Sequence, residues 1–411
     1  MTILRPWKWG GVVGVIACAI GIALNVKAAA PPAKQPPDRF LNPLELTTPD
    51  PLLPGGLNRP LSEAEKQTLR TALDQLDAEA NAKLRSGDVP GAFDIWNREL
   101  RLRRALGLLE EVQALGRVGN IAWIQNQQAQ VRFVTNRLSA IQTQVQQPLK
   151  NQVTIPDRAQ ILPALGIAFQ QVRSPGLALK VYQQMLTEAR ARRDAIAEVN
   201  LLNTIGQLHL SWFDYPNAIA TYTELLNLAR ARNDVQNVVA NLVQLAYTHE
   251  QAKQPAQAVT YQQQLIEIYQ RDPQQAGLIP ALKIRQADNF AASKQFEAAE
   301  KAYQEAFQLA QPLLQLAYAS DALRKLGALY RSNNRLDAAL QVYEYLASVQ
   351  QQAYDSFGVM DAFDQIGQIQ LQRNAPTEAV KAFQQGLEVA KQINHRVDYF
   401  TQQIQKIQAA K

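Results

Sequence analysis

The sequence repeats itself about every 40 residues, and this period constrains the fold more than any other feature. In each repeat a small residue is followed twelve residues later by alanine, and four residues further on usually by an aromatic residue. The small residues are Gly166, Gly206, Ala246, Ala287, Gly327 and Gly367; the alanines are Ala178, Ala218, Ala258, Ala299, Ala339 and Ala379; the aromatic residues are Tyr182, Tyr222, Tyr303, Tyr343 and Phe383, with Gln262 interrupting the series. Such a period indicates stacked copies of one supersecondary unit.

Each unit is predicted to be a pair of helices. The repeats are rich in Ala, Leu, Gln, Glu and Arg, which favour helix, and they lack the alternation of a strand. The small residue and the alanine let the two helices approach closely, and the aromatic residue is expected to fill the gap towards the next repeat. Turns such as 174–176 and 374–376 place proline at the start of the second helix, where its missing amide is harmless. Asp194 and Asp234 are expected to cap the helices that follow them.

Helix is expected from Ser62 onwards, because Ser62 and Glu65 have the spacing of a capping box. Residues 61–156 are expected to form irregular N-terminal repeats: Ala80, Ala92 and Trp96 keep the spacing, whereas the unit around Gly119 and Trp123 is out of register. An insertion near Pro148 to Pro156 suggests a hinge or kink. Residues 157–394 should form the regular array. Residues 395–411 should form a capping helix with Val397, Phe400, Ile404 and Ile407 facing inwards.

The pattern resembles the tetratricopeptide repeat family, in its subclass with long repeats of about 40 residues. The resemblance covers residues 62–411 and includes the segments Glu188–Asp194 and Leu228–Asp234, which are similar to the end of such a repeat. It implies an all-α, right-handed superhelical solenoid of about eight helix hairpins. It also implies an extended concave surface that binds protein segments.

Residues 1–28 are expected to be a signal peptide or an N-terminal membrane anchor. Arg5 and Lys8 precede an uncharged, mostly apolar run over 10–26, and cleavage is expected after Ala28, because Val26 and Ala28 then occupy the small-residue subsites. A run of about 17 residues is also just long enough to cross a bilayer, so an uncleaved anchor is the alternative. Cys18 is interpreted as an apolar residue of this run. The protein is therefore expected to be exported to a periplasm or lumen, or held at the inner membrane.

Residues 29–60 are expected to be an extended linker. Nine of the chain's 21 prolines lie in 31–60. Proline lacks an amide donor and fixes φ, so helix and sheet are not expected here.

Composition excludes several classes of protein. A single cysteine cannot form an internal disulfide, and three histidines make a histidine-rich metal centre unlikely by number alone. Without its first 28 residues the chain has 39 basic and 36 acidic residues, so its mixed charge does not indicate nucleic-acid binding. No nucleotide, metalloprotease or serine-hydrolase motif is present. The sequence therefore predicts a non-enzymatic protein without cofactor or metal. His209 and His249, 40 residues apart, are interpreted as packing residues.

The polar residues of the first helices are expected to line the concave groove and bind a peptide, because amides both donate and accept hydrogen bonds. The predicted set is Asn200, Asn203, Gln207, Gln244, Tyr247, Glu250, Arg285, Asp288, Arg324, Arg331, Asp364 and Gln368. Arg324 and Arg331 are expected to be able to hold a carboxylate. Trp212 and Phe213 form a second candidate contact, because they occupy a turn where glycine is usual.

Three functions remain open from the sequence. The first is a scaffold or adaptor that mediates protein–protein interactions at a membrane or in the periplasm or lumen. The second is a chaperone-like assembly or stability factor for an envelope or photosynthetic membrane complex. The third, an envelope enzyme, is the weakest, because no acid, base and nucleophile stand together in the sequence. The sequence does not identify the protein or peptide partner.

Overall fold

The computed structural model describes residues 42–54, 56, 60–146 and 157–409. The predicted signal peptide or anchor, Cys18, the first part of the linker and the insertion near Pro148 lie outside these residues. The described part of the chain is helical and contains no named strand. No helix within it is long and apolar enough to cross a membrane.

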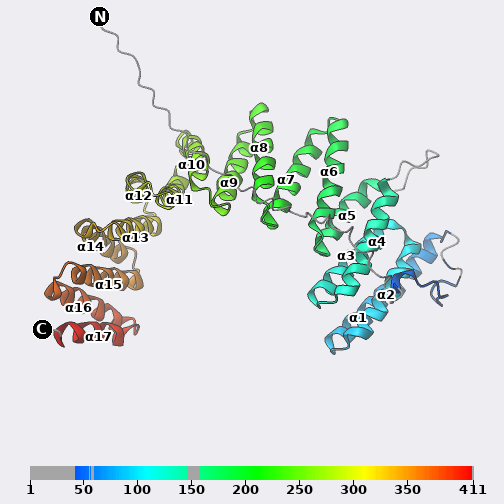
Figure 1. Cartoon of the computed structure of the whole chain (residues 1–411), viewed down its shortest axis with the longest axis horizontal. Helices are drawn as coiled ribbons and strands as arrows, with labels where there is room; N and C mark the ends of the chain where they lie inside the picture. Colours follow the sequence, from blue (N-terminus) through cyan, green and yellow to red (C-terminus); the bar gives the residue numbers. More distant parts are fainter. Residues whose placement is uncertain (1–41, 55, 57–59, 147–156, 410–411) are drawn as a thin grey trace, which may run out of the picture.

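The chain forms eight antiparallel helix pairs followed by one last helix, which confirms the predicted all-α solenoid (Figure 1). The pairs are α1 (Glu63–Arg85) with α2 (Val89–Arg103), α3 (Leu108–Ile124) with α4 (Gln128–Gln146), α5 (Arg158–Gln171) with α6 (Pro175–Ala191), α7 (Ala195–Ser211) with α8 (Tyr215–Ala231), α9 (Val235–Gln251) with α10 (Pro255–Gln270), α11 (Ile279–Ala292) with α12 (Phe296–Ala310), α13 (Leu316–Ser332) with α14 (Leu336–Gln352), and α15 (Ser356–Gln372) with α16 (Pro376–Gln392); α17 (Val397–Ala409) ends the array. The described residues also include the 3₁₀ helices η1 (Pro43–Glu45), η3 (Arg104–Leu106) and η4 (Ala276–Leu278).

The helix ends follow the sequence signals. The Glu65 amide donates to Ser62 Oγ at 3.3 Å and the Ser62 amide donates to Glu65 Oε2 at 2.8 Å, which confirms the capping box. Asp194 accepts from the Ala197 amide, and Asp234 accepts from the Asn237 amide, each at 3.0 Å. Proline lies at the start of α6, α10 and α16, as expected.

In the hairpins that contain both the glycine and the aromatic residue, the aromatic ring packs directly over the glycine. A Cβ atom placed on Gly367 would lie 2.6 Å from the Phe383 ring, and one on Gly327 would lie 2.7 Å from Tyr343. The aromatic residue therefore packs over the small residue of its own hairpin. The glycine leaves a recess within the hairpin that the ring occupies, and the Phe383 ring also lies 6.3 Å, between centroids, from the Phe400 ring of α17, the helix that follows its hairpin.

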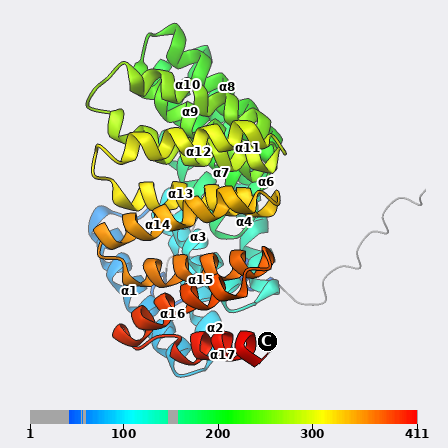
Figure 2. The same cartoon turned by 90° about the vertical axis from the view of Figure 1, so that its left-hand side faces the viewer.

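The solenoid is an open arch whose inner, concave side is lined by the odd-numbered helices (Figure 1). Turns that join one hairpin to the next, such as those after α12 and α14, share one edge, seen at the left of Figure 2. At the C-terminal end α17 covers the last hairpin: Phe400 and Ile407 are buried, and Val397 and Ile404 are half-buried.

The irregular stacking predicted near the N-terminus occurs at α3 to α5. Helix α5 packs mainly against α3 and much less against α4. Gly116 permits this approach, because a Cβ atom there would lie 3.0 Å from the Ala168 Cβ atom. Trp96 is buried as expected and donates to Asp77 Oδ1 at 2.8 Å, whereas Trp123 is exposed.

Residues 42–54, which we call the strap, are not a free linker. Leu44, in the middle of η1, is only 1% exposed. The Arg101 and Arg104 guanidinium groups donate to the carbonyls of Pro43 and Leu44, each at 2.7 Å. Asp50 accepts two hydrogen bonds from Arg98, at 2.7 and 2.9 Å. The expectation of an extended spacer does not hold for the strap, because Arg101 of α2 and Arg104 of η3 donate to backbone carbonyls of this proline-rich segment.

Candidate functional site

The concave face brings the predicted groove residues together on successive odd-numbered helices, but exposes them unequally. The exposed members are Asn200, Gln207, Tyr247, Arg285 and Arg324; the half-buried members are Asn203, Gln244, Glu250, Asp288, Arg331 and Gln368; Asp364 is buried. The set divides into an uncharged part on α7 and α9 and a charged part from Glu250 onwards. These two parts differ in whether their polar atoms are already used.

The uncharged part, which we call the amide strip, consists of Asn200, Asn203, Gln207, Gln244 and Tyr247. The side-chain Nδ2 of Asn203 donates to the Val199 carbonyl at 3.0 Å, so the side-chain oxygen of Asn203 takes no part in that bond. The side chains of the other four make no hydrogen bond within the part of the chain that the structure describes. The strip therefore presents unused donors and acceptors to the groove.

An apolar pocket opens beside the amide strip, between α9, α10 and α11. Its volume is about 170 Å³, and its lining is Val243, Ala246, Leu265, Tyr269, Leu278, Ala281, Leu282 and Arg285. Val243 and Leu278 are exposed at its mouth. The sequence interpretation missed this pocket because it selected polar residues only. Val243 lies three residues before the small residue Ala246, just as the predicted groove residue Asn203 lies three residues before Gly206.

Glu250 and Arg285 do not face the groove as free charges. Arg285 donates to Glu250 Oε2 at 2.5 Å, and Glu250 Oε1 accepts from Gln262 at 2.8 Å and from Asn289 at 3.0 Å. Gln262 is fully buried in the place of the missing aromatic ring and accepts a second bond from Asn289 at 3.2 Å. This network explains the interruption of the aromatic series, since each buried amide has a partner.

The charged part of the set forms contacts between neighbouring repeats. Asp288 accepts from Tyr303 and Lys325, each at 2.6 Å. Burial and this bond to Asp288 raise the pKa of the Tyr303 hydroxyl well above its usual value, so Tyr303 remains the donor. The predicted groove positions Asp288 and its neighbours are therefore occupied from within the array.

The same holds at the C-terminal end. Asp364 accepts from Arg396 at 2.7 Å and from Tyr399 at 2.8 Å. Gln368 donates to the Tyr399 hydroxyl at 3.2 Å. These contacts attach α17 to α15. A groove residue that is buried and bonded in this way stabilises the stack, whatever else it does.

The two arginines expected to hold a carboxylate are also engaged. Arg331 donates to Gln365 at 2.6 Å and to Gln372 at 3.2 Å, and Arg324 is paired with Asp321 on its own helix. A ligand carboxylate would have to displace these partners.

His209 and His249 lie in the last turns of helices α7 and α9. His209 is buried, and its Nδ1 lies 2.8 Å from Asp214 Oδ2. His249 is buried as well, with Nδ1 2.8 Å from Gln254 Oε1 and its ring stacked on Tyr261 at 5.3 Å between centroids. Both are packing residues, as predicted. No group of three His, Cys, Asp or Glu residues in the described ranges could hold a metal ion.

The second sequence candidate lies in the turn between α7 and α8. Trp212 is 40% exposed and Phe213 is 75% exposed, with φ of 61°. The Phe213 ring makes an edge contact with Tyr215, 6.3 Å between centroids. Neither side chain packs down into the core.

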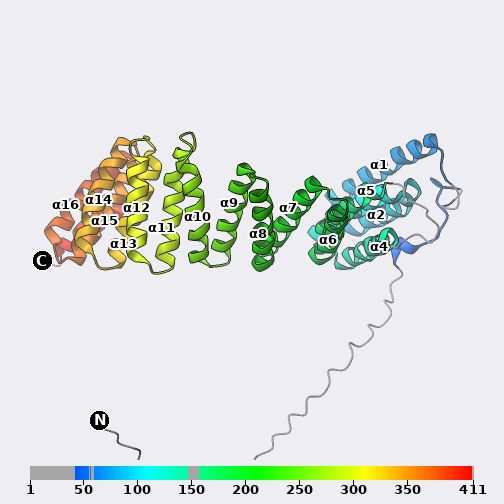
Figure 3. The ribbon, with the colours of Figure 1, turned by 90° about the horizontal axis from the view of Figure 1, so that it is seen from above.

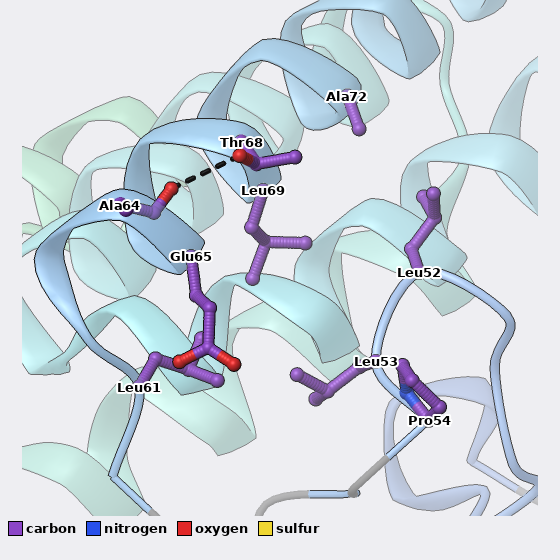
Figure 4. A pocket seen from close by; sticks show the side chains of 9 residues that line it. All are labelled: Leu52, Leu53, Pro54, Leu61, Ala64, Glu65, Thr68, Leu69 and Ala72. Carbon is purple, nitrogen blue, oxygen red and sulfur yellow. Dashed lines mark hydrogen bonds between the residues drawn. The ribbon is translucent and has the colours of Figure 1, made fainter.

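A further cavity, of about 320 Å³, lies where the strap meets α1 (Figure 4). Leu52, Leu53 and Pro54 form one wall, and α1 residues from Leu61 to Ala72 form the other. Among the described residues that line it, Glu65 is the one with a charge, and its carboxylate belongs to the capping box. The cavity therefore offers apolar volume and no reactive group.

The fold has the helical-repeat architecture that the resemblance to tetratricopeptide repeats implies: paired antiparallel helices, a step of about 40 residues, and a small residue against which an aromatic ring packs. No protein-family model matches the sequence, and no curated protein matches it.

Several solved structures are similar to parts of the chain. Aspartyl phosphate phosphatase F from Bacillus subtilis is 16% identical with a TM-score of 0.40, over 69% of this chain and 76% of that one. The C-terminal part of a TPR repeat-containing protein from Cytophaga hutchinsonii is 13% identical with a TM-score of 0.40, over 67% and 95%. BtubC from P. vanneervenii is 20% identical with a TM-score of 0.38, over 53% and 91%.

Proposed function

We propose that the protein is a non-enzymatic adaptor that binds an extended, uncharged segment of a partner protein along the amide strip. The observation that carries this proposal is the contrast within the groove. The amide strip has unused hydrogen-bonding atoms and no charge, whereas the charged groove residues are bonded to one another. A polypeptide backbone supplies the alternating donors and acceptors that such amides pair with.

The apolar pocket beside the strip supplies an anchor. A volume of about 170 Å³ accommodates one aliphatic or aromatic side chain of the bound segment. Anchoring of one apolar side chain while the neighbouring amides pair with the backbone is a common way to combine affinity with orientation. The partner segment is therefore expected to contain a leucine- or phenylalanine-like residue and few charges.

Site-specific crosslinking tests the proposal in the cells that make the protein. A photoreactive amino acid at Gln207, in the full chain, should capture a partner, and mass spectrometry should place the crosslink in an uncharged segment with an apolar residue. The same group at Asn227, exposed on α8 away from the concave side, is the matched control. A synthetic copy of the captured segment should bind the full chain and lose at least tenfold in affinity with Val243→Glu.

Two results would refute this function. One is capture of the same partner from Asn227 as efficiently as from Gln207. The other is a captured segment whose affinity is unchanged by Val243→Glu, with helicity retained. A time course of crosslinking also separates a permanent scaffold from an assembly factor, because a chaperone-like factor releases its client when the complex is complete.

The proposed cellular place follows from the leader. The adaptor is exported to a periplasm or lumen, or remains attached to the inner membrane by residues 10–26. Cell fractionation with N-terminal sequencing tests this: a chain that starts at Ala29 supports export and cleavage, and an intact leader in the membrane fraction supports the anchor. An intact chain in the cytoplasm contradicts both.

A further inference from the structure

The array has two edges, and they differ in how exposed aromatic and cationic side chains are arranged along them. The turns within hairpins α3–α4, α5–α6, α7–α8, α9–α10 and α11–α12 form what we call the hairpin edge. The turns that join successive hairpins form the opposite edge. Both kinds of turn contain a residue in the left-handed region, so corresponding positions can be compared directly along the chain.

Exposed aromatic residues project from the hairpin edge. Phe213 occupies the left-handed position of its turn, where asparagine stands in the turns at Asn126, Asn334 and Asn374. A bulky apolar side chain at this position is strained relative to asparagine and is also held in water. Trp212 beside it and Trp123 and Ile124 at the end of α3 are exposed as well. Nothing in the packing of the described residues accounts for these side chains.

Cations occupy the same left-handed position on the neighbouring turns. Arg173, Lys253 and Lys294 have φ of 57°, 58° and 59°, and all three are exposed. Within turn segments 123–127, 171–176, 211–217, 251–257 and 292–296, the one acid is Asp214. Its carboxylate is bonded to Asn217 and lies against His209. The hairpin edge is therefore aromatic at its centre and cationic on both sides.

The described chain also begins on this side of the array. Figure 3 shows the segment in deepest blue, residues 43–45, on the lower side, where the turn between α7 and α8 also lies. Arg101 and Arg104 hold this segment in place by donating hydrogen bonds to the carbonyls of Pro43 and Leu44. Ahead of it the sequence contains the uncharged run 10–26, which is long enough to enter a bilayer.

We propose that the hairpin edge lies against a membrane surface that contains anionic lipids. Tryptophan and phenylalanine reach into the headgroup region, where aromatic side chains are favoured, and lysine and arginine attract the lipid phosphates. Successive turns are at most about 20 Å apart, because each hairpin adds two helices at about 8–10 Å. A broad flat surface engages such a row, and contact along the edge leaves the concave face open.

The opposite edge provides a matched control. Tyr354 also has a left-handed φ, 55°, and is 94% exposed, in the turn between α14 and α15. The neighbouring segment 306–320 contains no charged residue. The segments 306–320 and 353–356 of this edge therefore present exposed apolar side chains without a cation, whereas Arg192, Arg193 and Arg271 lie in its other turns.

Oxidative footprinting of the full chain tests the proposal residue by residue. With vesicles of phosphatidylcholine and 30% phosphatidylglycerol, hydroxyl-radical oxidation of Trp212 and Phe213 should slow at least threefold, whereas oxidation of Tyr354 should stay unchanged. Protection should disappear when Arg173, Lys253 and Lys294 are all changed to Asn, which stands at the same position in other turns. Removal of Arg192, Arg193 and Arg271, exposed on the opposite edge, makes the same charge change and should preserve it. Any binding by the leader is common to every variant.

Four results would overturn the proposal. They are unchanged oxidation of Phe213 on vesicles, equal protection of Tyr354, equal protection on vesicles of phosphatidylcholine alone, and protection in buffer that rises with protein concentration. The last would assign the edge to a second copy of the chain. Each basic residue at an anionic surface contributes about fivefold in affinity, so the triple variant should lose about 100-fold and cannot be mistaken for the control.

Discussion

Because the Phe383 ring packs directly over Gly367, we predict that Gly367→Ala destabilises the C-terminal end of the array. The new Cβ atom would stand 2.6 Å from the fully buried Phe383 ring, where carbon atoms normally keep about 3.5–4.0 Å. The ring must therefore move by about 1 Å, towards Phe400 of α17, whose centroid is 6.3 Å away. Such overpacking costs about 1–3 kcal/mol, and the better helix propensity of alanine returns up to about 1 kcal/mol. The net loss should be about 1–2 kcal/mol.

Hydrogen exchange followed by mass spectrometry measures this loss locally, which matters because a repeat array does not unfold as one unit. Amides of α15 to α17 should exchange about 5–30-fold faster, with those of α5 to α8 unchanged. Gly206→Ala is the control: its Cβ atom would lie 3.0 Å from Tyr222, and Ala287 already packs with Tyr303 in this register. Exchange that is unchanged or slower in Gly367→Ala, or equally fast in both variants, would refute the reasoning.

Two more predictions concern polar contacts. The hydrogen bond from Arg98 lowers the pKa of the Asp50 carboxyl below its ordinary 3.8. The contact therefore stabilises the docked strap above pH 3.8, and this stabilisation is lost as the pH falls through the lower pKa of the folded state. Proteolysis of residues 42–54 should be slow at pH 7 and 5 and should become faster below about pH 4. Replacing Glu250 by Ala leaves the buried Gln262 and Asn289 amides without their acceptor, so α9 to α12 should lose about 1–3 kcal/mol in exchange measurements, while Glu250→Gln should lose much less; equal losses would contradict the network.

Sequence reasoning succeeded where a side chain acts on its own helix or hairpin. The caps at Ser62, Asp194 and Asp234 depend on residues three positions away, and the repeat register places His209 and His249 at equivalent buried positions near the ends of α7 and α9. Such features follow from local geometry and recur with the period. The period also fixes the position of the aromatic residue in the sequence, but not the close contact that its ring makes with the glycine of its own hairpin.

The docked strap could not be predicted, because proline content describes only what the backbone cannot do by itself. Arg101 and Arg104 look like ordinary polar positions of an amphipathic helix. Their donation to the carbonyls of Pro43 and Leu44 joins segments almost 60 residues apart, and no periodicity relates them.

The spacing in the sequence between paired groove residues contains information that the polarity of each residue alone does not give. Glu250 with Arg285 and Arg331 with Gln365 are 35 and 34 residues apart, somewhat less than one repeat. Asp288 with Lys325 is 37 apart. Because successive odd-numbered helices face the same groove, complementary side chains at this offset meet across the stack. A search for such pairs would have separated the structural contacts of the groove from its free atoms.

The distribution of these contacts bears on where a ligand acts. Side-chain hydrogen bonds join α9 to α11, α11 to α13 and α13 to α15, whereas none joins α5 to α7 or α7 to α9 in the described residues. The odd-numbered helices of the central repeats are thus held together by apolar packing, without polar cross-links on the groove side. A segment bound along the amide strip would supply the missing connection between α7 and α9. Binding there should therefore slow hydrogen exchange in α7 to α10 more than in α13 to α16, where the array already makes that connection itself.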